Sequence, residues 1–123
     1  MNTEEILFSF SLNLPDRVPP YRLSACIRCG GRLDVQESNK THPARQLSQK
    51  ENKFFFAALA DLGIAAWPPN CDCGVMDDSS WSLCIEHGRL HKKCFGVPGF
   101  EPEGWDALML LIEQTIKATI PQP

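Results

Sequence analysis

The chain has 123 residues, 43% of them hydrophobic, and a formal net charge of −3. This length and composition fit one domain with a modest core. The acidic balance disfavours a protein whose main partner is a nucleic-acid backbone. The longest apolar run, residues 54–60, is too short to cross a bilayer. The first residues also lack the basic segment of an export signal. We therefore expect a single domain over residues 1–123, located in the cytoplasm, without a membrane partner.

The first third of the chain predicts strands. Residues 6–14 alternate between apolar and mostly polar side chains, which is typical of a strand with one buried face. After a proline-rich connection at 15–20, residues 21–27 and 32–36 predict two further strands, joined through Cys29-Gly30-Gly31. A CxxCGG turn between strands is the form of a zinc knuckle, because glycine lets backbone amides turn toward the sulfurs.

The rest of the chain predicts three helices. The first covers residues 44–62, the second follows Ser79-Ser80 over 81–93, and the last covers 105–120. The fold class is then α+β: a small zinc-stabilised domain with a treble-clef-like knuckle hairpin and helix, additional helices and an N-terminal strand. The apolar side of the last helix has two candidate partners. We favour the first strand of the same chain over a second copy in a homodimer, because a small domain needs this burial.

The spacing of cysteine and histidine is the strongest functional signal in the sequence. Zinc takes four nitrogen or sulfur ligands, and closely spaced pairs donate two at a time. All six cysteines and two of the three histidines form four pairs, in chain order Cys26 with Cys29, Cys71 with Cys73, Cys84 with His87, and His91 with Cys94. Eight ligands predict two closed, structural Zn²⁺ sites. A disulfide framework is the alternative, which the short spacings and the histidines disfavour.

The assignment of these pairs to two sites stays open. On a helix, the third and fourth pairs span about 15 Å along the axis, so they cannot close one site together. In a cross-brace, the first and third pairs bind one zinc and the second and fourth pairs bind the other. In a nested arrangement, the first and fourth pairs share one zinc and the second and third pairs share the other. In a sequential arrangement, the first two pairs bind one zinc and the last two pairs bind the other, which becomes possible if Gly88 ends the helix early. We prefer the cross-brace, because a knuckle hairpin plus the first turn of a helix is treble-clef geometry.

Residues 77–91 resemble the C-terminal half of phage HNH-type (ββα-metal) endonucleases, and residues 26–30 resemble the knuckle that precedes it in that family. In that family an LCxxHH or LCxxCH signature follows an earlier CxxCG knuckle. The resemblance implies a treble-clef zinc fold in which the first and third pairs are the structural ligands. At the family's catalytic histidine this chain has Gly88, which can neither bind a metal nor move a proton. The remaining histidine, His42, lies in a polar Thr-His-Pro loop and is expected on the surface.

Closed metal sites without a catalytic histidine predict a non-enzymatic binding module. Such a module would act as an accessory, adaptor or inhibitor of another macromolecule, most simply another protein, in the manner of a phage or mobile-element protein. Residues 17–53 hold eight basic and three acidic side chains, so we place the binding surface on Arg17, Arg22, Arg28 and Arg32. An HNH-type metal-dependent nuclease is one alternative, and a nucleic-acid-binding regulator that uses the same basic segment is another.

Overall fold

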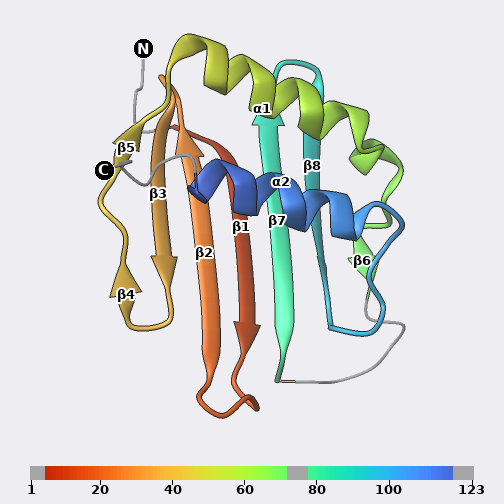
Figure 1. The fold of residues 1–123 in the computed structure, drawn as a ribbon. Coiled ribbons are helices and arrows are strands. Elements are labelled where there is room, and N and C mark those ends of the chain that lie inside the picture. Colours follow the sequence, from red (N-terminus) through yellow and green to blue (C-terminus); the bar gives the residue numbers. More distant parts are fainter. Residues whose placement is uncertain (1–4, 72–77, 118–123) are drawn as a thin grey trace.

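The computed structural model describes residues 5–71 and 78–117, which form one sheet with two α-helices on the same side (Figure 1). In chain order the strands are β1 (Ile6–Leu14), β2 (Tyr21–Arg28), β3 (Arg32–Glu37), β4 (Lys40–Thr41), β5 (Arg45–Gln46), β6 (Asn70–Cys71), β7 (Ser80–His87) and β8 (Leu90–Gly96). The helices are α1 (Gln49–Asp61), the 3₁₀ turn η1 (Ile64–Ala66) and α2 (Trp105–Lys117).

The sheet has β1 at its centre. Its strand order is β4-β3-β2-β1-β7-β8-β6, with β5 paired to β3 beside β4. All pairings are antiparallel except the short parallel contact of β6 with β8. The first strand of the sequence therefore joins two hairpins, β2–β3 and β7–β8, which come from distant parts of the chain.

The core lies between the helices and one face of the sheet. The alternation in β1 directs Phe8 and Phe10 to this face, where they are 1% and 0% exposed. Phe55 of α1 packs edge-on against Phe8 with 4.9 Å between ring centroids, and Trp105 of α2 lies 5.8 Å from Phe10. Trp81 of β7 stands 4.8 Å from Trp105. Burial of each such ring contributes about 1.5–3 kcal/mol to the stability of the fold, so the packing on this face holds the helices to the sheet.

Both helices have local reasons to begin or pack where they do. α1 starts at a capping box, in which the Ser48 hydroxyl accepts from the Glu51 amide and the Glu51 carboxylate accepts from the Ser48 amide. α2 buries Leu108, Leu111 and Ile112 against the sheet. This burial confirms the prediction that the apolar side of the last helix packs within its own chain.

The predicted elements agree with the structure in part, and the short strands β4, β5 and β6 were not predicted. The strands over 6–14, 21–27 and 32–36 are confirmed as β1, β2 and β3. The last helix is confirmed from Trp105 through Lys117, and residues 118–120 of that prediction lie outside the described residues. The first helix starts at Gln49, not at residue 44, because β5 precedes it.

The helix predicted over 81–93 is wrong. This segment forms β7 and β8, which meet at a turn where Gly88 has a φ of 57°. Trp81, Leu83 and Ile85 are buried while the residues between them are not, which is the period of a strand. The hairpin β2–β3 that carries the predicted knuckle is therefore followed by another hairpin at Cys84, and not by the helix of a treble clef.

Candidate functional site

The third predicted ligand pair is divided between the two faces of the sheet. Residues three apart on a strand point to opposite faces, whereas on a helix they share a side. Cys84 lies opposite Ser9, on the face that neither helix covers. His87 instead stacks on Phe56 of α1, with 3.9 Å between ring centroids and 7° between planes. In this fold the two side chains do not approach one metal from the same side.

The fourth pair is divided in the same way. His91 stands opposite Glu86 on the uncovered face, and the two side chains form a hydrogen bond through His91 Nδ1. That hydrogen bond and the charge of Glu86 raise the pKa of His91. Cys94 stands opposite Leu83 on the helix side and is 3% exposed. The pair therefore offers one side chain to each face.

The thiols of the predicted cross-brace lie on strands that are not neighbours. Cys26 of β2 and Cys84 of β7 both stand opposite Ser9, one on each side of β1. Two strand spacings amount to about 9.6 Å. Two sulfurs on one zinc lie at most about 4.6 Å apart, since each Zn–S bond is about 2.3 Å. Cys29, which directly follows β2, donates its backbone amide to the Glu5 carbonyl at 2.7 Å. Cys26 and Cys84 thus lie on the same face of the sheet with β1 between them, and a shared zinc would require both side chains to lean toward each other across this strand.

Cys71 and Cys94 are the predicted ligands that the fold does bring together. β6 runs parallel to β8, and Cys71 lies opposite Gly96, two residues beyond Cys94 on the same side of the sheet. Both thiols are buried. Burial, with a smaller contribution from the charge of Cys71, raises the pKa of Cys94 to about 11. Cys73 falls outside the described residues. Within residues 5–71 and 78–117, no group of three or more His, Cys, Asp or Glu is placed to hold a metal ion.

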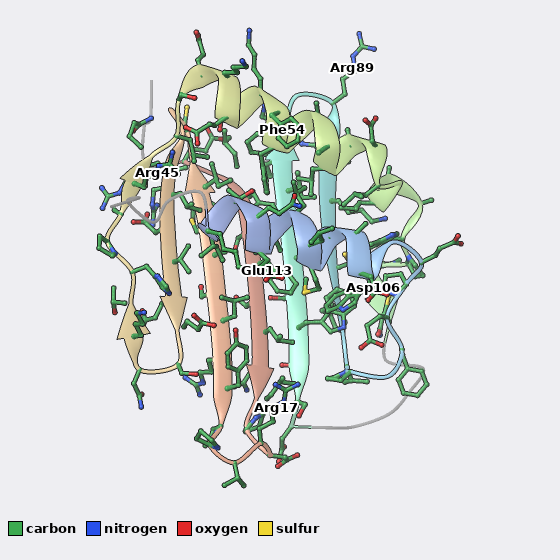
Figure 2. The ribbon with its side chains drawn as sticks, viewed as in Figure 1. Arg17, Arg45, Phe54, Arg89, Asp106 and Glu113 are labelled. Atoms are coloured by element: carbon green, nitrogen blue, oxygen red, sulfur yellow. The ribbon has the colours of Figure 1, made fainter. Side chains whose placement is uncertain are left out.

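Three of the four predicted binding arginines share the uncovered face of the sheet. Arg22 lies opposite Asn13 and bonds its amide oxygen at 3.1 Å. Arg28 and Arg32 bond the two carboxylate oxygens of Asp34 at 3.2 and 3.3 Å. Arg17 differs, because it belongs to the turn between β1 and β2, at the far end of the sheet from α1 in Figure 2. Its guanidinium lies 5.9 Å from the centroid of the Tyr21 ring.

The centre of this uncovered face consists of small polar side chains. On the neighbouring strands β2, β1 and β7, paired residues form two rows of hydroxyl or thiol side chains. The members are Ser9, Ser11, Ser24, Cys26, Ser82 and Cys84. Beside them on β8 stand Lys93, opposite Cys84, and Phe95, opposite Ser82, with Phe95 51% exposed. The face thus offers a polar centre with arginines along one side and an exposed aromatic ring along the other.

A second group of titratable residues lies on the helix side, where the sequence did not predict a site. The Tyr21 hydroxyl donates to Glu37 Oε2 at 2.7 Å, and His42 Nε2 lies 3.4 Å from Glu37 Oε1. Burial and the Glu37 carboxylate raise the pKa of Tyr21 to about 12. The same hydrogen bond holds the pKa of Glu37 below its usual value. His42 was expected on the surface, but its side chain is only 15% exposed, because it packs into this group.

Comparisons with protein-family models, with curated proteins and with solved structures gave no match to this chain. Within the described ranges, neither α-helix is long and apolar enough to span a membrane.

Proposed function

We propose that this protein is a non-catalytic binding module that docks the acidic surface of another protein on the uncovered face of its sheet. The observation that carries the proposal is charge segregation. The chain as a whole has a net charge of −3. The strand residues of this face carry four basic groups, Arg22, Arg28, Arg32 and Lys93, against the two acids Asp34 and Glu86.

The composition of the face also suits recognition of a protein. Arginine and aromatic residues supply much of the binding energy at interfaces, and Phe95 stands exposed beside the serine-rich centre. The side chain of Arg32 is 57% exposed, which leaves donors for a partner carboxylate besides the bond to Asp34. The small hydroxyls between these residues let a partner approach the strands closely. An acidic partner would be attracted and oriented by the basic side chains of this face.

We also propose that zinc supports the fold at Cys71 and Cys94. These buried thiols lie on neighbouring strands, and Cys73 follows two residues after Cys71 in the sequence. Zinc would bind the thiolates and so remove the protons that burial otherwise favours on Cys94. The zinc would then join the edge strand β6 to its neighbour β8.

Site-specific photo-cross-linking in cells tests the docking face. A photoreactive amino acid is placed at Ser24, which is exposed on the uncovered face, and at Ala57, which is exposed on α1, as the matched control. We expect a protein adduct from position 24 and none from position 57. The charge reversals Arg22→Glu and Lys93→Glu should together remove the adduct, whereas Lys53→Glu on α1 should retain it. Arg28 and Arg32 are left intact because they bond Asp34.

The same experiment separates the competing functions. A nuclease-sensitive adduct from position 24, with affinity that falls steeply as salt rises, would instead indicate a nucleic-acid-binding regulator. A protein adduct that persists in the Arg22→Glu, Lys93→Glu variant, or that forms equally from position 57, would contradict docking by charge on this face. Unchanged melting temperatures of the variants ensure that any loss reflects binding.

A further inference from the structure

A cleft borders α2 on the helix side of the sheet, away from the docking face proposed above. Its volume is about 500 Å³, and pockets of about 300–1,000 Å³ commonly hold small molecules. Met109, Ile112 and Ile116 of α2 line one side of the cleft, and Leu12 of β1 and Leu23 of β2 line the side formed by the sheet. An organic molecule in this cleft would bury an apolar body between the helix and the sheet.

The cleft has a carboxylate at one end, Glu37 on β3. Its two oxygens already contact the Tyr21 hydroxyl at 2.7 Å and His42 Nε2 at 3.4 Å. A carboxylate has about four acceptor positions, so these two contacts leave room for a further donor. The Glu37 side chain is 40% exposed, which keeps it within reach of a ligand. The hydrogen bond from Tyr21 lowers the pKa of Glu37, so the group is ionised near neutral pH.

The second carboxylate at the cleft is already paired. Glu113, labelled in Figure 2, lies on the edge of α2 away from α1, and its Oε1 is 2.7 Å from Lys117 Nζ, four residues along the helix. Lys40 lines the rim from the exposed strand β4 and lowers the pKa of Glu37 through its charge. The fixed acceptor beside the apolar walls is therefore Glu37.

We infer that this cleft binds a small amphipathic cation, with its apolar body between α2 and the sheet and its protonated amine against Glu37. The apolar walls supply area that is removed from water. The ammonium supplies a charge-assisted hydrogen bond to a carboxylate that Tyr21 holds in place. A ligand with a carboxylate in the place of the amine would meet a like charge.

Three probes with the same apolar body test this inference: phenylbutylamine, phenylbutanol and phenylvalerate. Tyr21 is the only tyrosine in the chain, so tyrosine labelled with ¹³C at Cε gives a single NMR ring signal from the cleft. We expect the amine to shift this signal with a dissociation constant of about 1 mM or lower, in the range of small ligands. The alcohol and the carboxylate should bind at least about tenfold more weakly, since they lack the charge-assisted bond.

Matched variants then assign the charge. Glu37→Gln should weaken binding of the amine about tenfold, whereas Glu113→Gln, which removes the carboxylate already paired with Lys117, should change it by less than about twofold. Met109→Trp fills the cleft from α2 and should weaken binding of all three probes, which tests the location of the site if Glu37→Gln does not fold. Equal binding of the three probes, no shift of the Tyr21 signal, or an equal loss from Glu113→Gln would overturn the inference.

Discussion

Replacing Gly96 by alanine should destabilise the protein strongly, although alanine normally suits a strand better than glycine does. A Cβ at this position would lie 2.7 Å from the Cys71 carbonyl oxygen, 2.7 Å from Cζ2 of Trp81 and 2.8 Å from Cys71 Cβ. Comfortable carbon contacts are about 3.5–4.0 Å. Two of these atoms belong to the β6 strand and the third to a tryptophan that is 2% exposed, so no flexible side chain can yield.

We expect Gly96→Ala to cost about 3 kcal/mol, the upper end of the range for overpacked cores. For a domain of this size that cost corresponds to a fall in melting temperature of roughly 10–15 °C, followed by circular dichroism. Gly88→Ala is the control. Its Cβ would meet nothing within 4 Å, so the cost comes from its positive φ alone, about 1 kcal/mol. A Gly96→Ala protein that melts within a few degrees of wild type, or above Gly88→Ala, would refute the close contact of β6 with β8.

Three further predictions concern the titration of Tyr21, the zinc content and nuclease activity. The phenol of Tyr21 should titrate near pH 12 by ultraviolet absorbance. The folded state prefers the protonated phenol, so this contribution to stability is complete below about pH 10 and is lost as the pH rises through about 12. In Glu37→Gln the midpoint should move toward 10, and an unmoved midpoint would contradict the hydrogen bond. Elemental analysis should show that Cys94→Ser loses bound zinc and that Cys84→Ser, two strands from Cys26, keeps the wild-type content; zinc loss from Cys84→Ser would favour the cross-brace. The protein should not cleave DNA with magnesium, manganese or nickel, because glycine occupies position 88, and cleavage abolished by His42→Ala would support the nuclease alternative.

The sequence predicted the elements whose hydrophobic pattern has a single interpretation. In β1, polar residues separate Phe8, Phe10 and Leu12 in strict alternation, which excludes a helix with one apolar side. In α2 the apolar residues recur at helical spacing, and the proline and glycine residues before it leave no competing pattern. Both elements follow from local sequence, and the structure confirms them.

The segment from Ser80 to Cys94 shows why the metal prediction was harder. Cys84, His87, His91 and Cys94 fall on one side of a helical wheel, so the ligand spacing itself favoured a helix. The apolar residues Trp81, Leu83 and Ile85 instead follow the two-residue period of a strand. Burial favours the strand over the helix, because burying three large side chains stabilises the fold more than a capping serine stabilises a helix. Ligand spacing therefore predicted metal binding by these residues but not the face of the sheet to which each side chain points.

The site around Glu37 was out of reach for a different reason. Tyr21, Glu37 and His42 form no motif, and nothing in the polar loop before Pro43 distinguishes a buried histidine from an exposed one. They meet because β2 and β3 pair with Leu23 opposite Glu37, and because His42 donates its backbone amide to the Val35 carbonyl at 3.0 Å. A strand register is a tertiary property, since a shift of one residue would send Glu37 to the opposite face.

The two faces of the sheet then have different chemistry for a physical reason. The helix side must be apolar to hold α1 and α2, so a polar group is tolerated there only with partners, as Glu37 is with Tyr21 and His42. Among the described residues, neither α-helix packs on the uncovered side, so the side chains there can make contacts outside the chain. Serines and arginines there cost the fold little, and an exposed Phe95 has no role in the core. The residues that the fold does not require are thus the residues that the docking proposal uses.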